Sequence, residues 1–166
     1  MASNKYTTDK FGINLTSRPT NLAQAMVVNV AVQVGLVDLL TALKVKVEGF
    51  IGHSIGDVVC GYCDGFLTKE ETLLTIHTIG EVLTKKSQVK SLEEINGKLR
   101  LQICDSLVKV IFQPGNGNKS KRKKSDRWVS STVSPDDARS ENGNYITPEF
   151  FARTVTSSGV ENLVEK

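Results

Sequence analysis

The chain has 166 residues, a length that fits one domain or part of one. Apolar residues make up 39% of it, enough for one hydrophobic core, and no apolar run approaches the ~18 residues that a membrane-spanning helix requires. The net charge of +3 comes from one basic run at 119–127, because the rest of the chain is slightly acidic. The N-terminal residues are polar and lead into no apolar segment, which argues against a secretory signal. These features favour a soluble protein of the cytoplasm and argue against a membrane span.

The three cysteines, Cys60, Cys63 and Cys104, form an odd number and no ligand-like group. Cys60 and Cys63 are close in sequence, but with only two histidines in the chain a zinc site lacks partners. We therefore expect reduced thiols and no metal site.

Residues 1–19 are polar and show no clear period, so we predict an irregular lead-in. Thr20 can cap the helix that follows, in which apolar residues recur at three- and four-residue spacing from Leu22 to Leu43. This helix is apolar on more than one side, which predicts a buried position. The apolar run 49–51 then predicts a short buried strand.

A G-x-S-x-G pentapeptide joins this strand to a helix predicted over 55–62, and its residues are Gly52, His53, Ser54, Ile55 and Gly56. Strand, sharp turn and helix are the setting of a nucleophile elbow, which holds a serine hydroxyl exposed at the turn. We predict that Ser54 is this nucleophile and that the Ile55 N–H is an oxyanion donor. Gly52 and Gly56 are expected because a Cβ at either position would crowd the neighbouring strand and helix. The alternative is a glycine-rich turn with an incidental serine.

The chain has two histidines, His53 and His77. His53 directly precedes Ser54, and since the side chains of neighbours diverge at a sharp turn, we expect His53 to support the loop rather than act as general base. A Ser–His dyad needs an approach to about 3 Å, and nothing in the sequence turns His77 toward the elbow. His77 is therefore a candidate base only if the fold brings it to Ser54.

The remaining predicted elements are a helix over 69–83, opened by a capping box of Thr68 and Glu71, a helix over 99–112, a strand over 128–133 and a helix over 149–155. The basic run is expected to be a solvated loop without a nucleic-acid partner, because no aromatic residues are interleaved with it for base stacking. The alternative is a nuclear-import or nucleic-acid patch. The chain is thus divided into an irregular lead-in (1–19), a core with the elbow (20–112), a basic loop (113–127) and a C-terminal part of the same domain (128–166).

Four segments, in the same order, resemble the malonyl/acetyl-transferase domain of animal fatty acid synthase. The most specific is residues 49–71, where the family's run G-H-S-x-G-E-x-x-C-x-Y-A-D-G appears with Asp57 in place of the glutamate. The other three are 29–46, 126–134 and 145–160. The resemblance implies an α/β fold, a partial hydrolase-like acyltransferase core with a parallel sheet flanked by helices.

The resemblance also implies a reaction. Ser54 would attack the thioester of acetyl- or malonyl-CoA to give an acyl-serine, and the phosphopantetheine thiol of an acyl carrier protein would collect the acyl group in fatty acid biosynthesis. The implied partners are an acyl carrier protein or other parts of a fatty acid synthase, and the domain binds no cofactor. Gly52, His53 and Gly56 are then motif residues that support the nucleophile.

The chain departs from the family's pattern at several catalytic positions. The carboxylate-binding arginine of the family falls on Ile79, which cannot bind a malonyl carboxylate. The ferredoxin-like subdomain, the histidine of an F-H-S motif and the G-x-G-S-Q segment with the second oxyanion donor are missing, and the C-terminal part is incomplete by comparison. The alternatives are an inactive acyltransferase remnant, a docking piece of a larger synthase, and an α/β serine hydrolase, which is disfavoured because no histidine follows His77.

Overall fold

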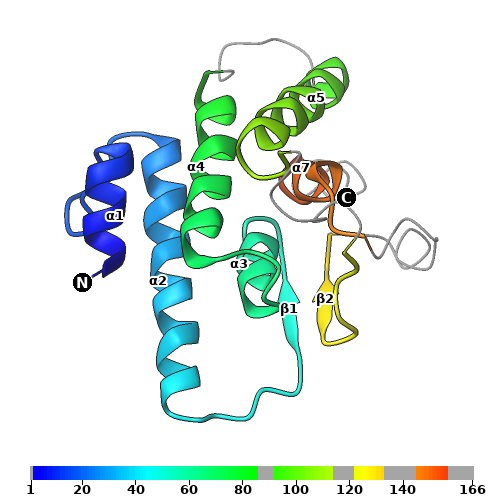
Figure 1. The fold of residues 1–166 in the computed structure, drawn as a ribbon. Coiled ribbons are helices and arrows are strands. Elements are labelled where there is room, and N and C mark those ends of the chain that lie inside the picture. The colour runs from blue at the N-terminus through cyan, green and yellow to red at the C-terminus, as the bar shows by residue number, and fades with distance from the viewer. Residues whose placement is uncertain (1, 86–91, 114–121, 133–144, 157–166) are drawn as a thin grey trace, which may run out of the picture.

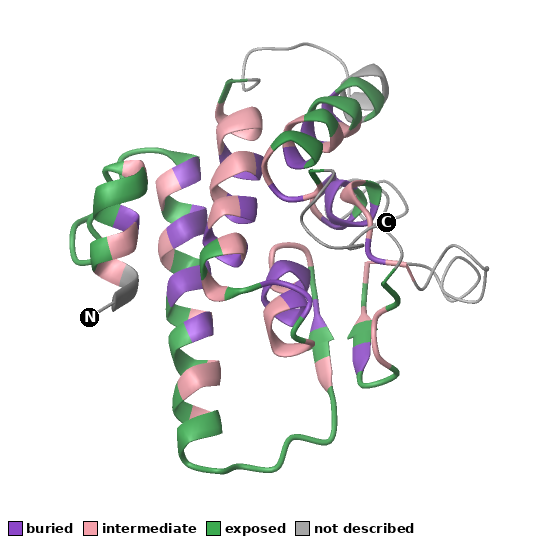
Figure 2. Ribbon diagram, viewed as in Figure 1, coloured by how far each residue is buried: buried purple, intermediate pink, exposed green. Residues whose placement is uncertain are grey.

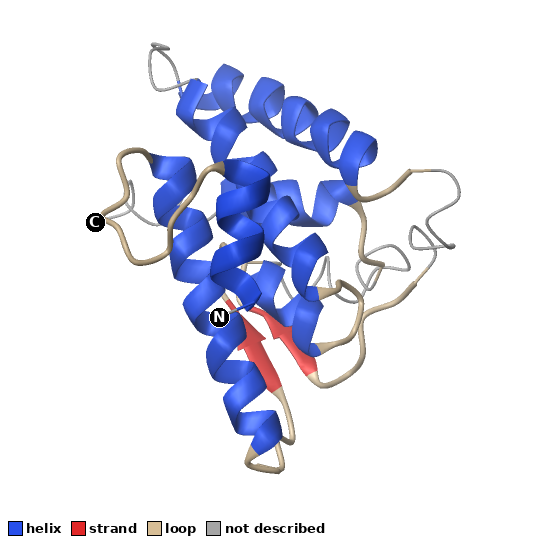
Figure 3. Ribbon diagram, turned by 60° about the vertical axis from the view of Figure 1, so that its left-hand side comes forward, coloured by secondary structure: helices blue, strands red, loops and turns tan. Residues whose placement is uncertain are grey.

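The structure is a computed structural model that describes residues 2–85, 92–113, 122–132 and 145–156. Its elements, labelled in Figure 1, are α1 (Ala2–Phe11), α2 (Leu22–Ala42), β1 (Phe50–Gly52), α3 (Gly56–Cys63), α4 (Lys69–Lys85), α5 (Leu92–Val110), β2 (Trp128–Ser130) and α7 (Pro148–Thr156). Most of the described chain is helical, and the two short strands lie side by side (Figure 3). Helices α2, α3, α4 and α7 confirm the helices predicted there, within two residues at either end.

The two strands pair in parallel, with Phe50 opposite Trp128, Ile51 opposite Val129 and Gly52 opposite Ser130. This confirms the predicted parallel sheet flanked by helices, although the second strand ends at Ser130 and not at 133. Helix α3 packs on one face of the sheet, where Trp128 is fully buried. On the other face Ile51 and Val129 are 75% and 53% exposed. Parallel strands are usually covered on both faces, so the described residues leave one apolar face open.

Helix α2 packs along α4 through its N-terminal half. Gly80 permits the close approach of the two helices, because a Cβ there would lie 2.6 Å from the Cα of Ala23. Val27 and Val30 of α2 and Ile76 of α4 are fully buried in the core that the helices share. The apolar period of the sequence thus positions the two helices that lead into and out of the elbow.

The N-terminus of α2 differs from the prediction in one detail. The cap residue is Asn21 rather than Thr20, since the Asn21 side chain accepts a hydrogen bond from the Gln24 N–H at 2.9 Å. Thr20 instead donates its N–H and its hydroxyl to the side chain of Gln24, both at 2.9 Å. The two residues together fix the start of the helix.

The C-terminal half of α2 is largely exposed, which corrects the prediction that the whole helix is buried. Leu36 and Leu39 are 54% and 53% exposed, and the C-cap residue Leu43 is 65% exposed. In Figure 1 this half extends past the ends of α1 and α4, and Figure 2 shows no buried residues in the part of α2 beyond Val34. Among the described helices, α2 alone has the length and hydropathy of a membrane-crossing helix, and the core helices of soluble proteins share these properties.

Helix α1 lies in the lead-in that was predicted to be irregular. Its sequence is polar and shows no apolar period, so tertiary contacts rather than pattern stabilise it. Thr7 is fully buried, and the rings of Tyr6 and Phe11 pack edge to face with centroids 5.7 Å apart. The Asn4 side chain accepts the N–H of Leu15 at 2.8 Å, which holds the following turn against the helix.

Helices α4 and α5 begin in different ways. The predicted capping box of α4 is confirmed, since Thr68 Oγ1 accepts the Glu71 N–H at 3.1 Å and Glu71 Oε2 accepts the Thr68 N–H at 2.9 Å. Helix α5 starts at Leu92, well before the predicted 99. Its first turns were not predicted because they contain Gly97, and glycine is a poor helix former.

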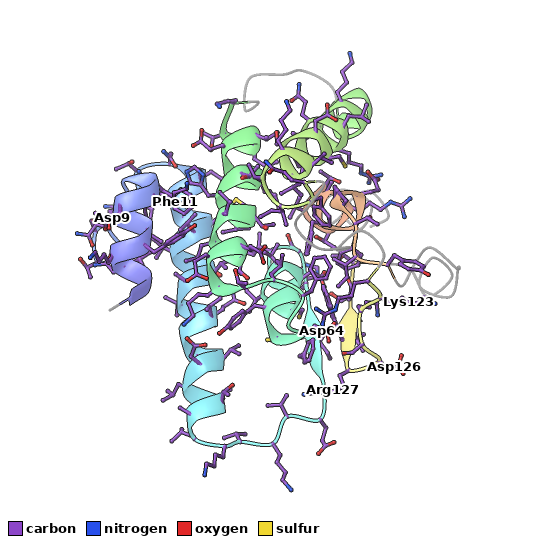
Figure 4. The ribbon with its side chains drawn as sticks, in the orientation of Figure 1. Asp9, Phe11, Asp64, Lys123, Asp126 and Arg127 are labelled. Carbon is purple, nitrogen blue, oxygen red and sulfur yellow. The ribbon has the colours of Figure 1, made fainter. Side chains whose placement is uncertain are left out.

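Three basic side chains of the run at 119–127 bind backbone carbonyls of their own chain. They are Arg122, Lys124 and Arg127, whose acceptors are the carbonyl oxygens of Gly65, Trp128 and Val47, each at 2.7 Å. Figure 4 shows Arg127 and Asp126 near the start of β2. Residues 119–121 lie outside the described residues. Most of 122–127 is exposed, as a solvated loop predicts, and these hydrogen bonds join the segment to the chain around the two strands and the end of α3.

Candidate active site

The turn between β1 and α3 holds Ser54 in a strained backbone conformation. Its φ is 53°, in the left-handed region that residues other than glycine rarely adopt. Two hydrogen bonds close the turn, from the Gly56 N–H to the His53 carbonyl at 2.9 Å and from the Asp57 N–H to the Ser54 carbonyl at 3.1 Å. Strained backbone of this kind clusters at functional sites. A strained serine between a strand and a helix is the geometry that a nucleophile elbow requires.

The two glycines beside Ser54 have different surroundings. A Cβ on Gly52 would lie 2.2 Å from Oδ1 and 2.8 Å from Cα of Asp57, so a side chain does not fit between β1 and α3 at this position. A Cβ on Gly56 would meet nothing within 4 Å, which corrects the prediction that this position is crowded. The close packing is therefore on the strand side of the turn only.

The N-terminus of α3 presents a hydrogen-bond donor next to Ser54. Ile55 is the N-cap residue of this helix, and its N–H has no acceptor within the described part of the chain. The helix dipole adds positive potential at the same end. This arrangement suits a negatively charged oxygen, and the oxyanion role of Ile55 stays a prediction.

Directly behind the turn, the side chain of Asp57 is fully buried. Its Oδ1 accepts a hydrogen bond from Trp128 Nε1 at 2.9 Å, and its Oδ2 accepts from the hydroxyls of Ser130 at 2.8 Å and Thr132 at 3.0 Å. Burial raises the pKa of this carboxyl above its ordinary value, and the three hydrogen bonds and the nearby His53 partly oppose the rise. The carboxyl group joins the first turn of α3 to β2 and to the residues that follow β2.

Ser131 binds the turn from the other side of the same segment. Its N–H and its hydroxyl both donate to the Gly52 carbonyl, at 2.9 Å and 3.1 Å. Its Oγ also lies 2.9 Å from Nδ1 of His53. The Ser131 hydroxyl therefore contacts both the Gly52 carbonyl and the imidazole of His53. The His53 ring is thereby fixed to the elbow.

The family profile of the acyl transferase domain matches residues 14–112. The chain belongs to the acyl transferase domain family. A highly reducing polyketide synthase of Neurospora crassa is 35% identical over 74 residues, which are 45% of this chain and 3% of that protein. A highly reducing polyketide synthase of Strobilurus tenacellus is 28% identical over 136 residues, which are 81% of this chain and 4% of that protein. The family match confirms the resemblance to an acyltransferase. The chain spans only a few per cent of the length of these relatives.

In this acyl transferase domain the fold does not bring His77 to Ser54. The His77 ring stacks on Phe11 of α1, with centroids 4.2 Å apart and an angle of 14° between the rings. Figure 4 shows Phe11 at the α1 side of the molecule, whereas β1 and β2 lie at the opposite side. Burial lowers the pKa of His77, in keeping with its packed position.

The position aligned with the family's carboxylate-binding arginine lies in the core. Ile79 is fully buried in α4, among the apolar residues that helices α2 and α4 share. It therefore offers neither a charge nor an accessible surface to a substrate carboxylate.

The three cysteines are free thiols that their surroundings keep protonated. Burial raises the pKa of Cys60 and of Cys104 to about 12, and it raises the pKa of Cys63 above its ordinary value. Since the thiolate is the reactive form, none of the three is activated as a nucleophile at neutral pH.

Sequence reasoning found the turn but missed the polar cluster around Asp57. Its donor Trp128 is 71 positions away, and periodicity gives no reason to pair the two. One usable signal is the alternation of Trp128, Ser130 and Thr132, which places three donors on one face of an extended segment. A second is the acidic side chain in the first turn of the otherwise apolar α3.

Proposed function

We propose that this acyl transferase domain moves an acyl group from coenzyme A to the phosphopantetheine thiol of an acyl carrier protein, with Ser54 as the nucleophile. The observation that supports this best is the φ of 53° at Ser54, on the turn between β1 and α3. A serine keeps such a conformation only where its surroundings over-determine it. The family match supplies a chemical reason for holding a serine in this way.

In the first step, the Ser54 hydroxyl oxygen attacks the thioester carbonyl of the acyl-CoA and gives its proton to a base. The Ile55 N–H donates to the oxyanion of the tetrahedral intermediate. The intermediate collapses by breaking the carbon–sulfur bond, and the coenzyme A thiol leaves with the proton. In the second step the pantetheine thiol attacks the serine ester in the same way and restores the Ser54 hydroxyl.

Neither histidine of the chain is assigned as the general base of this mechanism. The chain has two histidines; His77 stacks on Phe11, and Nδ1 of His53 is bound to Ser131. General base catalysis typically contributes ~10²–10⁴-fold to the rate. We therefore expect slow formation of the acyl-serine by this chain alone.

The buried Ile79 favours a neutral acyl group over malonyl, because no positive charge is available at that position for a second carboxylate. The printed names of the relatives point to polyketide assembly, and the resemblance to animal fatty acid synthase points to fatty acid synthesis. Both settings use the same transfer from coenzyme A to a carrier protein, and both fit a cytoplasmic protein.

The test is intact-mass spectrometry after incubation with acetyl-CoA or malonyl-CoA, with the Ser54→Ala variant alongside. We expect an acetyl adduct on the wild-type chain that is absent from Ser54→Ala and that disappears when an acyl carrier protein with its phosphopantetheine arm is added. A folded wild-type chain that forms no adduct with either donor would overturn catalysis.

The second candidate is a non-catalytic acyltransferase-like piece that docks on a larger synthase. The observation that favours it is the open apolar face of the sheet, where Ile51 and Val129 lie opposite one another and are more than half exposed. The absence of an acetyl adduct from a folded chain, together with self-association of that chain, would support this candidate instead. No observation in the described residues favours the serine hydrolase.

A further inference from the structure

We propose that Asp57 is a positioning residue, which acts with the hydroxyl side chains of residues 130–132 to hold Ser54 in its left-handed conformation. The inference rests on the nucleophile role proposed above. It adds side chains that act through Ser54 and not on the substrate.

Asp57 fixes the turn both through its backbone and through its side chain. Its N–H donates to the Ser54 carbonyl at 3.1 Å, and its carboxyl group occupies the space that a Cβ of Gly52 would need, 2.2 Å from that position. A change in the conformation of Ser54 displaces either the Gly52 backbone or the start of α3, and Asp57 contacts both. The turn therefore has little freedom as long as Asp57 stays in place.

The hydroxyl groups of residues 130–132 hold this arrangement from both sides. Ser130 and Thr132 donate to the Asp57 carboxyl group, and their own hydroxyl oxygens lie 3.0 Å apart within hydrogen-bond distance. Ser131 points the opposite way and donates to the Gly52 carbonyl. One short segment thus binds the residue before the turn and the residue after it, which is the support that a precisely held nucleophile needs.

A second carboxylate in the molecule provides a natural comparison. Asp64, at the other end of α3, accepts the Ser125 N–H at 3.0 Å and also binds the Ser125 hydroxyl. Like Asp57 it joins α3 to the chain around β2, but it is only partly buried and it lies at the opposite end of the helix from Ser54. Figure 4 labels Asp64 near the start of β2. Replacing Asp64 removes carboxylate hydrogen bonds between α3 and the chain near β2, at the end of the helix that is distant from the turn.

Two variants at Asp57 separate hydrogen bonding from packing. Asp57→Leu keeps similar bulk but removes every acceptor. Asp57→Asn keeps an oxygen for Trp128 and gains an NH₂ group that can donate to the hydroxyl oxygens of Ser130 and Thr132, so it preserves the network. Asp64→Leu is the matched control, because it removes the carboxylate hydrogen bonds at the other end of the helix.

Two measurements on each variant read different properties. NMR of the backbone, through the ¹³C shifts and the one-bond Cα–Hα coupling of Ser54, reports the sign of φ. Labelling of Ser54 by a fluorophosphonate, with Ser54→Ala as the blank, reports the reactivity of its hydroxyl. We expect Asp57→Leu to lose the positive-φ signature and to label more slowly, on the order of 10–10²-fold, because small displacements of a nucleophile are costly. Asp57→Asn and Asp64→Leu are expected to keep both properties.

A folded Asp57→Leu variant that retains the positive φ at Ser54 would overturn the positioning role, and so would an Asp57→Asn variant that loses it. If Asp57→Leu does not fold, Thr132→Val decides instead, since it removes one donor and keeps the shape of the side chain. Unchanged labelling and an unchanged φ signature in that variant would overturn the proposal. A wild-type chain that shows the positive φ but no labelling would contradict the proposed function of Ser54 and leave the positioning role standing, so the two failures are distinguishable.

Discussion

The turn around Ser54 and the C-terminal half of α2 differ in what their side chains contact. At the turn, the side chains of Asp57, Trp128 and Ser131 bind specific partners across the sheet. In α2, Leu36 and Leu39 are about half exposed, and the described residues do not cover them. The comparison indicates that the site depends on a few directed contacts, whereas the apolar surface tolerates change. The predictions below test this difference, beginning with the largest effect.

The change Gly52→Ala is expected to have the largest effect at the turn. The new Cβ would lie 2.2 Å from Oδ1 of Asp57 and 2.8 Å from its Cα, so rotation of the Asp57 side chain alone does not relieve the clash. We expect a loss of about 3 kcal/mol or more in the free energy of unfolding, because overpacking against fixed backbone is among the costliest substitutions. Urea denaturation monitored by circular dichroism measures this loss.

The matched control is Gly56→Ala, where the added Cβ meets nothing within 4 Å and the residue starts a helix. We expect this variant to be as stable as the wild-type chain. If Gly52→Ala and Gly56→Ala lowered the free energy of unfolding equally, close packing between β1 and Asp57 would not be the cause of the loss.

The next largest effect is expected from Trp128→Phe. The ring keeps its apolar contacts, but the buried Oδ1 of Asp57 loses its donor at 2.9 Å. Hydrogen bonds to charged groups contribute roughly 1.5–3 kcal/mol, so the free energy of unfolding should fall by about that amount. The double variant Trp128→Phe with Asp57→Leu should lose less than the sum of the two single losses, because Asp57→Leu already removes the acceptor of the indole N–H. Strict additivity would mean that the two side chains do not interact.

A smaller effect is the pH dependence of stability that Asp57 contributes. Burial raises its pKa above the ordinary 3.8, so between 3.8 and the raised value the folded chain keeps a proton that the unfolded chain has lost. The free energy of unfolding therefore decreases as pH rises through this window and is level above it. The difference between the wild-type chain and Asp57→Asn isolates this contribution, because all other groups are common to both.

This pH dependence has a convenient reporter. Trp128 is the one tryptophan of the chain, so its indole N–H gives a single NMR signal, and that signal should shift as Asp57 titrates. An indole signal that moves only at or below pH 3.8 would contradict the raised pKa.

The smallest effect on stability is expected at the exposed leucines in the C-terminal half of α2 and at its C-cap. Leu36→Gln, Leu39→Gln and Leu43→Gln should each change the free energy of unfolding by no more than about 0.5 kcal/mol, as surface substitutions usually do. Analytical ultracentrifugation should show less self-association, because an apolar patch is removed. Val30→Gln, in the buried half of the same helix, is the control that should fail to fold. A large loss at Leu39 would mean that this half of α2 is covered in solution.

The sequence predicts the elements that carry a strong local pattern. The elbow is identified by its glycines and serine, and the start of α4 by the capping box of Thr68 and Glu71. The length of α2 follows from its apolar period, and the parallel sheet follows from the family resemblance. In each case the information lies within a few neighbouring residues or in a motif.

The missed features depend on contacts between residues that are distant in sequence. Helix α1 has no apolar period and is stabilised by the burial of Thr7 and by the contact of Phe11 with His77. The network of Asp57 needs residues more than seventy positions away. The burial of α2 was wrongly predicted along its whole length, because an apolar period shows what a helix can bury and not where its partners end.

The measurement that tests the central claim most directly is tandem mass spectrometry of the folded chain after incubation with acetyl-CoA. The account predicts one acetyl group, on Ser54, which is lost in Ser54→Ala and transferred to an acyl carrier protein when one is added. Acetyl groups found only on lysines or cysteines, or on none of the residues, would contradict Ser54 as the nucleophile of this acyl transferase domain.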